Sequence, residues 1–357
     1  MDEDEATHGT QSSSTPTSIC TLPNELLIQI FCWVCLPNLC TAWDSATDSP
    51  KFSTALALVC SRWRHLMRNM PVVLSHIDIF VHRSNDPKCL ALAKTYLTRA
   101  KQVPLDIHIV DRAINRWPAL TDLCNILDLG SPRMRSLTFQ QEVYSQNVGR
   151  EVLNHCLGRN LPGLLKELNI VTDDRGQGRV FIEAGDSAIP HSYPPMVLSH
   201  ISVDRLEAIF LSVETLRLCG AFPYWTSSAY CGLVELSLHS KRDRTRTLQI
   251  SQSSLWRILL SSPKLQILDL NLNLTDLSAS TAVPIHLDDL QVLRTGSMPM
   301  HKFGYLLKFL FPGPKPLTLC CCGYRGRGVL AGDTGITAFL GRAKRQSIVP
   351  VVRARTC

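Results

Sequence analysis

The side chains of this 357-residue chain that could do chemistry are clustered cysteines, a glycine-containing motif and a basic segment. Cys32, Cys35 and Cys40 have the spacing C-x2-C-x4-C, and closely spaced cysteines are common zinc ligands. A closed structural site needs four ligands, so Cys60 or a histidine would have to complete it. Because Cys32 and Cys35 fall within a predicted apolar helix, we interpret them as core residues and expect no metal site.

Motifs for catalysis are missing from the sequence. It contains no GxxxxGKS/T, no HExxH and no GxSxG, which mark phosphate, zinc-protease and hydrolase sites. Residues 326–331 read GxGxxA, but a dinucleotide site needs an acidic residue about 20 positions later, and the last acid of the chain is Asp333. We therefore expect no cofactor and no catalytic residue. An enzyme whose site is assembled from scattered residues remains an alternative.

The basic charge of the chain lies at its C-terminal end. Residues 323–357 hold seven Lys or Arg and one acid, which accounts for nearly all of the net charge of +7. The segment includes RGRG at 325–328 and RAKRQ at 342–346, so nucleic-acid binding through it is a second alternative. Since few aromatic residues accompany these charges, we expect a solvated arm and no nucleic-acid binding.

The cysteine content and the N-terminal sequence indicate an intracellular protein, cytoplasmic or nuclear. Fourteen cysteines follow no regular spacing, as a disulfide framework would. Residues 1–18 are acidic and then rich in Ser and Thr, without the apolar core of a signal peptide. No run approaches the roughly 18 apolar residues of a membrane-spanning helix. We expect reduced thiols and no membrane partner.

Two helices are predicted near the N-terminus. Apolar residues recur at steps of three and four from Leu22 to Val34, and Pro23 suits the first helical position. This helix should stop near Leu36 and Pro37, before a loop over residues 37–51. The pattern predicts a second helix over residues 52–70 and strands over VVLSHIDIFV and PLDIHIV further on.

The middle of the chain contains a repeated template that is apolar at i, i+3 and i+5. Several copies follow a predicted helical stretch, and the central leucines are separated by 31, 48, 20, 32 and 25 residues. The copies lie at residues 134–139, 165–170, 213–218, 233–238, 265–270 and, more faintly, 290–295. A regular leucine-rich repeat has a period of about 20–29 residues, so this pattern predicts an irregular leucine-rich-repeat-like solenoid. Residues 172–195 should interrupt it as a loop with a short hairpin.

The segments LPNELLIQIF at 22–31 and VCSRW at 59–63 resemble an F-box, in particular the F-box-like modules at the front of fungal proteins with degenerate leucine-rich repeats. The resemblance implies a Skp-type adaptor of SCF ubiquitin ligases as partner, with Trp63 internal. The residues that it implies would face the adaptor are Leu22, Pro23, Leu26, Leu27, Ile30, Phe31, Val59 and Cys60. The sequence departs from the family pattern in its insertion at 37–51.

Together these features predict an α/β repeat protein. The expected parts are a tail at 1–18, an F-box-like helical module at 19–80, a degenerate leucine-rich-repeat-like domain at 81–310 and a basic tail at 311–357. The resemblance implies a non-catalytic adaptor that docks on the Skp-type protein, and through it on cullin, and that holds an unknown target on its repeats. The alternative is a leucine-rich interaction protein outside any ligase, whose N-terminal helices only cap the solenoid.

Overall fold

The computed structural model divides the chain into two compact units, Met1–Leu74 and Ser75–Cys357. The predicted tail at 1–18, the insertion at 37–51 and nearly all of the basic segment at 323–357 lie outside the described residues. The residues that the structure describes are 19–35, 52–81, 87–111, 120–141, 146–172, 180–187, 195–240, 249–277, 283–296, 298–321, 339 and 341.

The first unit is helical. Its elements are the 3-10 turn η1 (Ile19–Thr21) and the helices α1 (Asn24–Cys35), α2 (Phe52–Val59) and α3 (Ser61–Asn69). The predicted first helix is confirmed, but the predicted helix over 52–70 is two helices. Cys60 separates them with an extended backbone at φ −156° and ψ 171°, and its Sγ accepts a hydrogen bond from the Trp63 backbone N–H at 3.5 Å. Cys60 therefore caps α3 at its N-terminus.

The second unit is built on a nine-stranded parallel sheet. The strands lie in the sheet in the order in which they occur along the chain, and each neighbouring pair is parallel. They are β1 (His76–Val81), β2 (Leu105–Asp111), β3 (Met134–Gln141), β4 (Glu167–Thr172), β7 (Thr215–Cys219), β9 (Glu235–His239), β11 (Ile267–Asn271), β14 (Val292–Thr295) and β16 (Thr318–Cys321). The observed architecture is thus α/β with a mostly parallel sheet.

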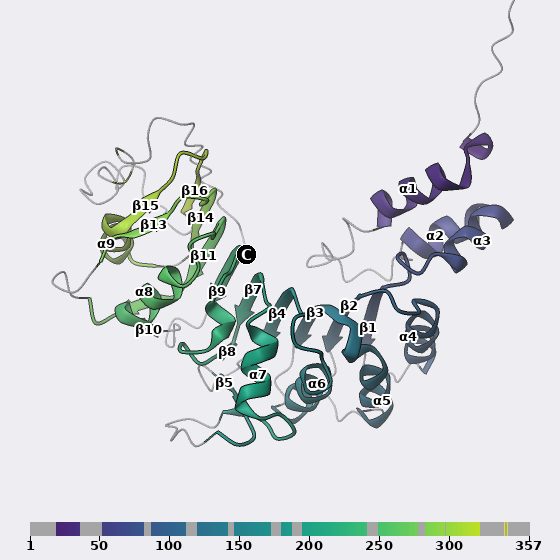
Figure 1. The fold of residues 1–357 in the computed structure, drawn as a ribbon, viewed down its shortest axis with the longest axis horizontal. Helices are drawn as coiled ribbons and strands as arrows, with labels where there is room; N and C mark the ends of the chain where they lie inside the picture. Colours follow the sequence, from purple (N-terminus) through teal and green to yellow (C-terminus); the bar gives the residue numbers. More distant parts are fainter. Residues whose placement is uncertain are drawn as a thin grey trace, which may run out of the picture. The chain divides into compact units, whose positions relative to one another are not determined.

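Helices and short strands form a second layer on one face of this sheet (Figure 1). The helices are α4 (Pro87–Arg99), α5 (Leu120–Gly130), α6 (Gln146–Gly158), α7 (Val203–Phe210), α8 (Gln252–Leu260) and α9 (Met300–Phe309). The 3-10 turns are η2 (Ser131–Arg133) and η3 (Ser228–Tyr230). The short strands are β5 (Val180–Ala184), β6 (Met196–Leu198), β8 (Ala221–Pro223), β10 (Gln249–Ser251), β12 (Asn273–Thr275), β13 (Ile285–Leu287) and β15 (Leu310–Pro312). None of the helices described is long and apolar enough to cross a bilayer.

The repeated apolar template forms the strands of the main sheet and aligns across it. The i+3 residues of successive copies are direct partners in the parallel register, and all six are fully buried. They are Leu137, Leu168, Leu216, Leu236, Leu268 and Leu293. The i+5 residue of each copy lies two positions further along the strand and is at most 2% exposed. The template therefore marks the side of the strands that packs on the second layer, as period-two alternation requires.

The sheet extends beyond the range in which repeats were expected. All but the last residue of β1 falls in the range predicted for the N-terminal module, 19–80, yet β1 pairs with β2. β16 falls in the range predicted as a tail, 311–357, yet it pairs with β14. Within the predicted loop at 172–195, β5 pairs with β6 and β8 in parallel, so the expected hairpin is wrong. Parallel partners lie far apart along the chain, and no local turn signal reports them.

Two buried thiols lie on the neighbouring helices α5 and α6. Burial, together with the nearby carboxylates of Glu151 and Asp128, raises the pKa of Cys124 to about 11. Burial also raises the pKa of Cys156, which is fully buried. Both thiols therefore keep their protons in the folded protein at a pH at which an unfolded cysteine has lost its own.

We predict that the free energy of unfolding falls as pH rises from about 9 towards about 11, because only the unfolded state releases the Cys124 proton there. Below that range both states are protonated, and the stabilisation is fully present. Urea unfolding measured below pH 9 and near pH 11 checks this. Cys124→Ala should show a weaker pH dependence, and an unchanged dependence would contradict the assignment.

Candidate functional site

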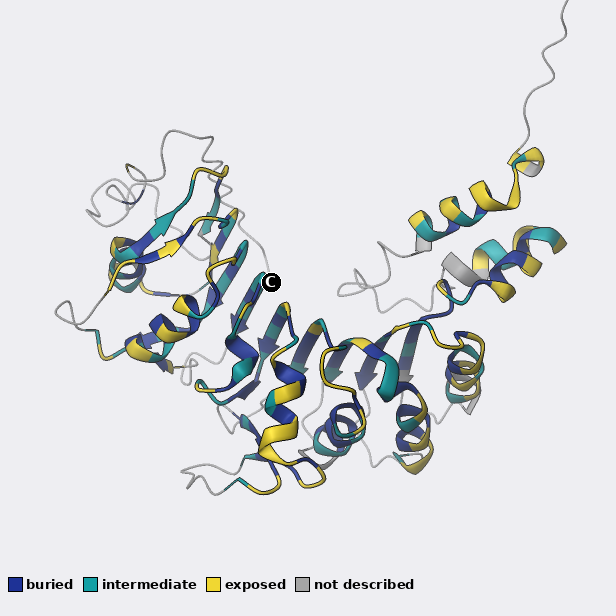
Figure 2. Ribbon diagram, viewed as in Figure 1, coloured by how far each residue is buried: buried dark blue, intermediate teal, exposed yellow. Residues whose placement is uncertain are grey.

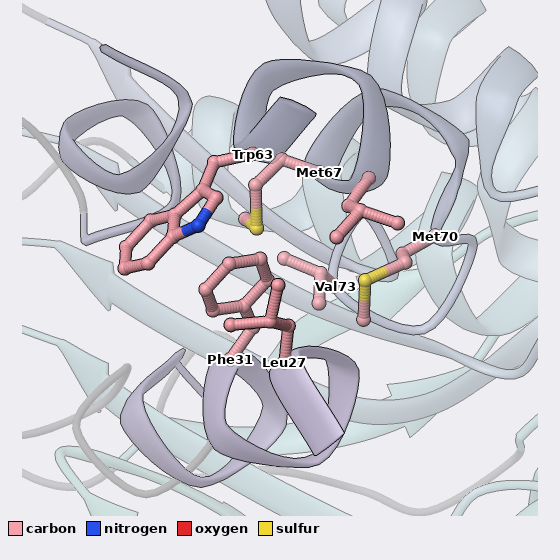
Figure 3. Close-up of a cluster of buried hydrophobic side chains, with 7 residues drawn as sticks. Leu27, Phe31, Trp63, Met67, Met70 and Val73 are labelled. Carbon is pink, nitrogen blue, oxygen red and sulfur yellow. The ribbon is translucent and has the colours of Figure 1, made fainter. Parts of the chain in front are cut away.

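The three helices of the first unit share one apolar core. Leu27 and Phe31 on α1 point towards Trp63 and Met67 on α3 (Figure 3). The rings of Phe31 and Trp63 meet edge to face, with their centroids 4.8 Å apart at 63°. Trp63 is 8% exposed, so its predicted internal position is confirmed. The other buried members of the core are Leu66, Met70 and Val73.

A second apolar stripe on α1 is exposed at Leu26 and Trp33 and half-buried at Ile30. Leu26, Ile30 and Trp33 follow one another at steps of four and three residues, which places them on one side of the helix, next to the buried stripe of Leu27 and Phe31. Leu26 is 44% exposed and Trp33 is 76% exposed. An exposed tryptophan beside an exposed leucine is unusual on a helix that already buries one apolar stripe.

Exposed apolar residues also lie at the end of α2. Leu58 is 68% exposed and Val59 is 59% exposed. Figure 2 shows exposed positions along α1 and at the C-terminal end of α2. These side chains contribute little to the core of the first unit, so a binding partner would be a reason for their apolar character.

The structure separates the eight residues predicted to face a partner into three groups. Leu27 and Phe31 are fully buried in the core, where a partner would not reach them. Leu22, Ile30 and Cys60 are half-buried and pack against that core. Pro23, Leu26 and Val59 are exposed. Trp33 and Leu58 are exposed as well. They are absent from the predicted set because that set contains only residues of the F-box-like motif.

Arg62 is a structural residue that the sequence analysis did not identify. Its Nη2 donates hydrogen bonds to the Leu22 carbonyl oxygen at 2.6 Å and to Asn24 Oδ1 at 2.7 Å, and its Nε donates to the same Asn24 oxygen at 3.0 Å. The guanidinium on α3 thereby holds the first turn of α1. The sequence does not predict this contact, because the partners of Arg62 lie about 40 residues away along the chain.

We predict that Arg62→Ala loosens α1 by about 1–2 kcal/mol, since the contacts to Leu22 and Asn24 are lost. The amides of α1 should then exchange with solvent about 5- to 30-fold faster, as measured by hydrogen exchange with mass spectrometry. Arg62→Lys should lie in between, because an ammonium lacks the planar fork. Arg68→Ala, an exposed arginine on the same helix, is the control. Equal effects at both positions would contradict the assignment.

The cysteines of the first unit form no described metal cluster. Cys32 is half-buried, and burial raises the pKa of its thiol, as expected for a core cysteine. The Cys60 sulfur caps α3. The side chain of Cys35 and the whole of Cys40 lie outside the described residues, so the four-ligand alternative stays untested.

The face of the main sheet opposite the second layer is polar. One row of directly paired residues crosses all nine strands on this face: Asp78, His108, Thr138, Asn169, Arg217, Ser237, Asp269, Arg294 and Cys320. Charges on this face are paired. Arg217 forms a bidentate ion pair with Glu235 at 2.7 Å, and His239 lies 3.0 Å from Asp269. His108, Thr138 and Asn169 in this row are buried. From Arg217 to Cys320 the residues of the row are half-buried or exposed, so this part of the face offers hydrogen-bonding groups to a macromolecule.

Comparison with known proteins gives no match: no protein-family model matches the sequence, and neither does any curated protein.

Proposed function

We propose that the protein is a non-catalytic, substrate-recruiting subunit of an SCF-type ubiquitin ligase. The observation that carries the proposal is the exposed apolar stripe on α1, which contains Leu26 and Trp33. Leu26 is also part of LPNELLIQIF, the segment that resembles an F-box. The stripe would dock on a Skp-type adaptor, and cullin would join through that adaptor.

The docking energy would come mainly from apolar burial. Removing apolar surface from water contributes about 25 cal/mol per Å² as a gross term, from which the costs of association are subtracted. Leu26, Trp33, Leu58 and Val59 are between 44% and 76% exposed, so they have surface left to bury. Pro23 begins the same stripe one turn before Leu26.

The target would bind the second unit, which we interpret as an irregular leucine-rich-repeat-like domain. The aligned leucines on one side of the strands and the paired charges on the other support this reading. A polar array selects its ligand by complementary hydrogen bonds and charges, so it does not reveal the target's identity. Transfer of ubiquitin would be the work of the E2 and RING partners, as the resemblance implies.

The experiment is co-expression of the full-length chain with a Skp-type adaptor and cullin, followed by size-exclusion chromatography. The proposal expects a stoichiometric complex that contains all three proteins. A protein that elutes folded and free of adaptor would refute the ligase role.

The second candidate is an interaction protein outside any ligase. The complete burial of Leu27 and Phe31 favours it, because two of the eight residues implied to face the adaptor serve the core of the helical unit instead. Affinity purification of the full chain distinguishes the two. Recovery of protein partners without adaptor or cullin would support the second candidate.

A further inference from the structure

Three side chains with metal-binding atoms meet at the first two strands of the main sheet. His76 and Asp78 lie two residues apart on β1, so both project from the same face. His108 on β2 is the direct register partner of Asp78. Asp78 Oδ1 lies 2.9 Å from His76 Nε2 and 3.0 Å from His108 Nδ1. One carboxylate oxygen thus lies within hydrogen-bonding distance of two imidazoles.

The cluster is buried. The side chains of His76, Asp78 and His108 are 3%, 7% and 9% exposed. A buried carboxylate needs strong compensation for its lost hydration, which imidazole N–H groups or a cation can supply. The backbone holds the three residues in place through strand pairing, so the arrangement costs little further ordering.

The donor set suits a transition metal. Two imidazole nitrogens and one carboxylate oxygen are ligands for Zn²⁺, whereas Ca²⁺ and Mg²⁺ prefer oxygen alone. The three ligand atoms lie within 4.8 Å of one another. Bonds of about 2.0–2.1 Å in a tetrahedron place neighbouring ligand atoms about 3.3 Å apart, so the two contacts to Asp78 would lengthen by a few tenths of an ångström. The two imidazole nitrogens, at most 4.8 Å apart, would move towards that same separation.

We propose that His76, Asp78 and His108 form a zinc site, with the fourth position taken by water. On binding, each ligating nitrogen gives up its proton, either to solvent or by moving it to the other ring nitrogen. The metal neutralises the buried carboxylate and joins β1 to β2. The site belongs to the second unit and does not depend on the ligase role.

The test is zinc titration of the full-length chain, stripped with a chelator, in competition with a chromophoric chelator. The proposal expects one tightly bound Zn²⁺. His108→Asn and Asp78→Asn should each weaken binding at least about 100-fold, because even changes outside the ligand shell cost about 10–100-fold. His155→Asn is the matched control, since His155 also contacts an aspartate, Asp128, at 2.8 Å. It should bind zinc like the wild type.

Cobalt distinguishes this site from the cysteines. Co²⁺ bound by the proposed ligands gives visible ligand-field bands without the near-ultraviolet thiolate charge-transfer band. Zinc should also raise the melting temperature of the wild type, but not that of Asp78→Asn, a near-isosteric variant chosen to stay folded. Absence of stoichiometric zinc in the wild type, a thiolate band with cobalt, or wild-type affinity in a folded Asp78→Asn variant would each overturn the proposal.

Discussion

Leu26→Asp is expected to abolish recovery of a Skp-type adaptor with the full-length protein while the protein stays folded. Leu26 is 44% exposed, so the free protein can solvate the new carboxylate. In the proposed interface the same carboxylate would be buried against apolar surface without a partner. Such a charge costs about 3–5 kcal/mol, which weakens binding by more than about 100-fold. Pull-down with purified adaptor measures the loss.

Two neighbouring variants make this result interpretable. Leu27→Asp places the charge in the core instead, so it should unfold the helical unit, as circular dichroism and hydrogen exchange would report. Leu129→Asp alters another exposed leucine, on α5 and 56% exposed, and should leave adaptor binding unchanged. Ile30 is a poorer choice, because it packs against the core cluster. Undiminished binding by Leu26→Asp would remove the proposed interface.

Leu268→Ala is expected to destabilise the second unit by about 3 kcal/mol. Leu268 is fully buried on β11, between its register partners Leu236 on β9 and Leu293 on β14. Truncation leaves a cavity that the neighbouring strands cannot close, because their own pairing fixes their spacing. The midpoint of urea unfolding reports the change.

The matched control for Leu268 lies eight residues earlier. Leu260 ends α8 and is 51% exposed, so Leu260→Ala should change the free energy of unfolding by no more than about 0.5 kcal/mol. A comparable loss at both positions would mean that leucine content rather than the aligned row stabilises the sheet.

Much of the second unit's fold is predictable from the sequence. The template at i, i+3 and i+5 identifies six strands, because alternation along a strand buries every second residue. Leu74, Ile77 and Ile79 fit it as well and lead into β1, although this copy lies in the range expected for the N-terminal module. β16 does not fit the template, because Pro316 and Cys321 stand at its first and last apolar positions.

The candidate site is less predictable. Periodicity places Leu26 and Leu27 on one apolar side of α1, but it does not reveal that Leu27 faces α3 while Leu26 faces solvent. That division depends on how α1 packs, which is a tertiary property. The Arg62 contacts to Leu22 and Asn24 have the same origin. The buried cluster of His76, Asp78 and His108 depends on the register between β1 and β2, in which Asp78 pairs with a residue 30 positions later in the sequence.

The order of strands in the main sheet has a consequence for biosynthesis. Every strand from β2 onwards pairs with the sheet strand that precedes it along the chain, and none has to wait for a later strand to begin its pairing. As the chain leaves the ribosome, each new strand of the main sheet can therefore pair with a strand that has already been synthesised. The main sheet of the second unit can thus assemble from its N-terminal edge during translation.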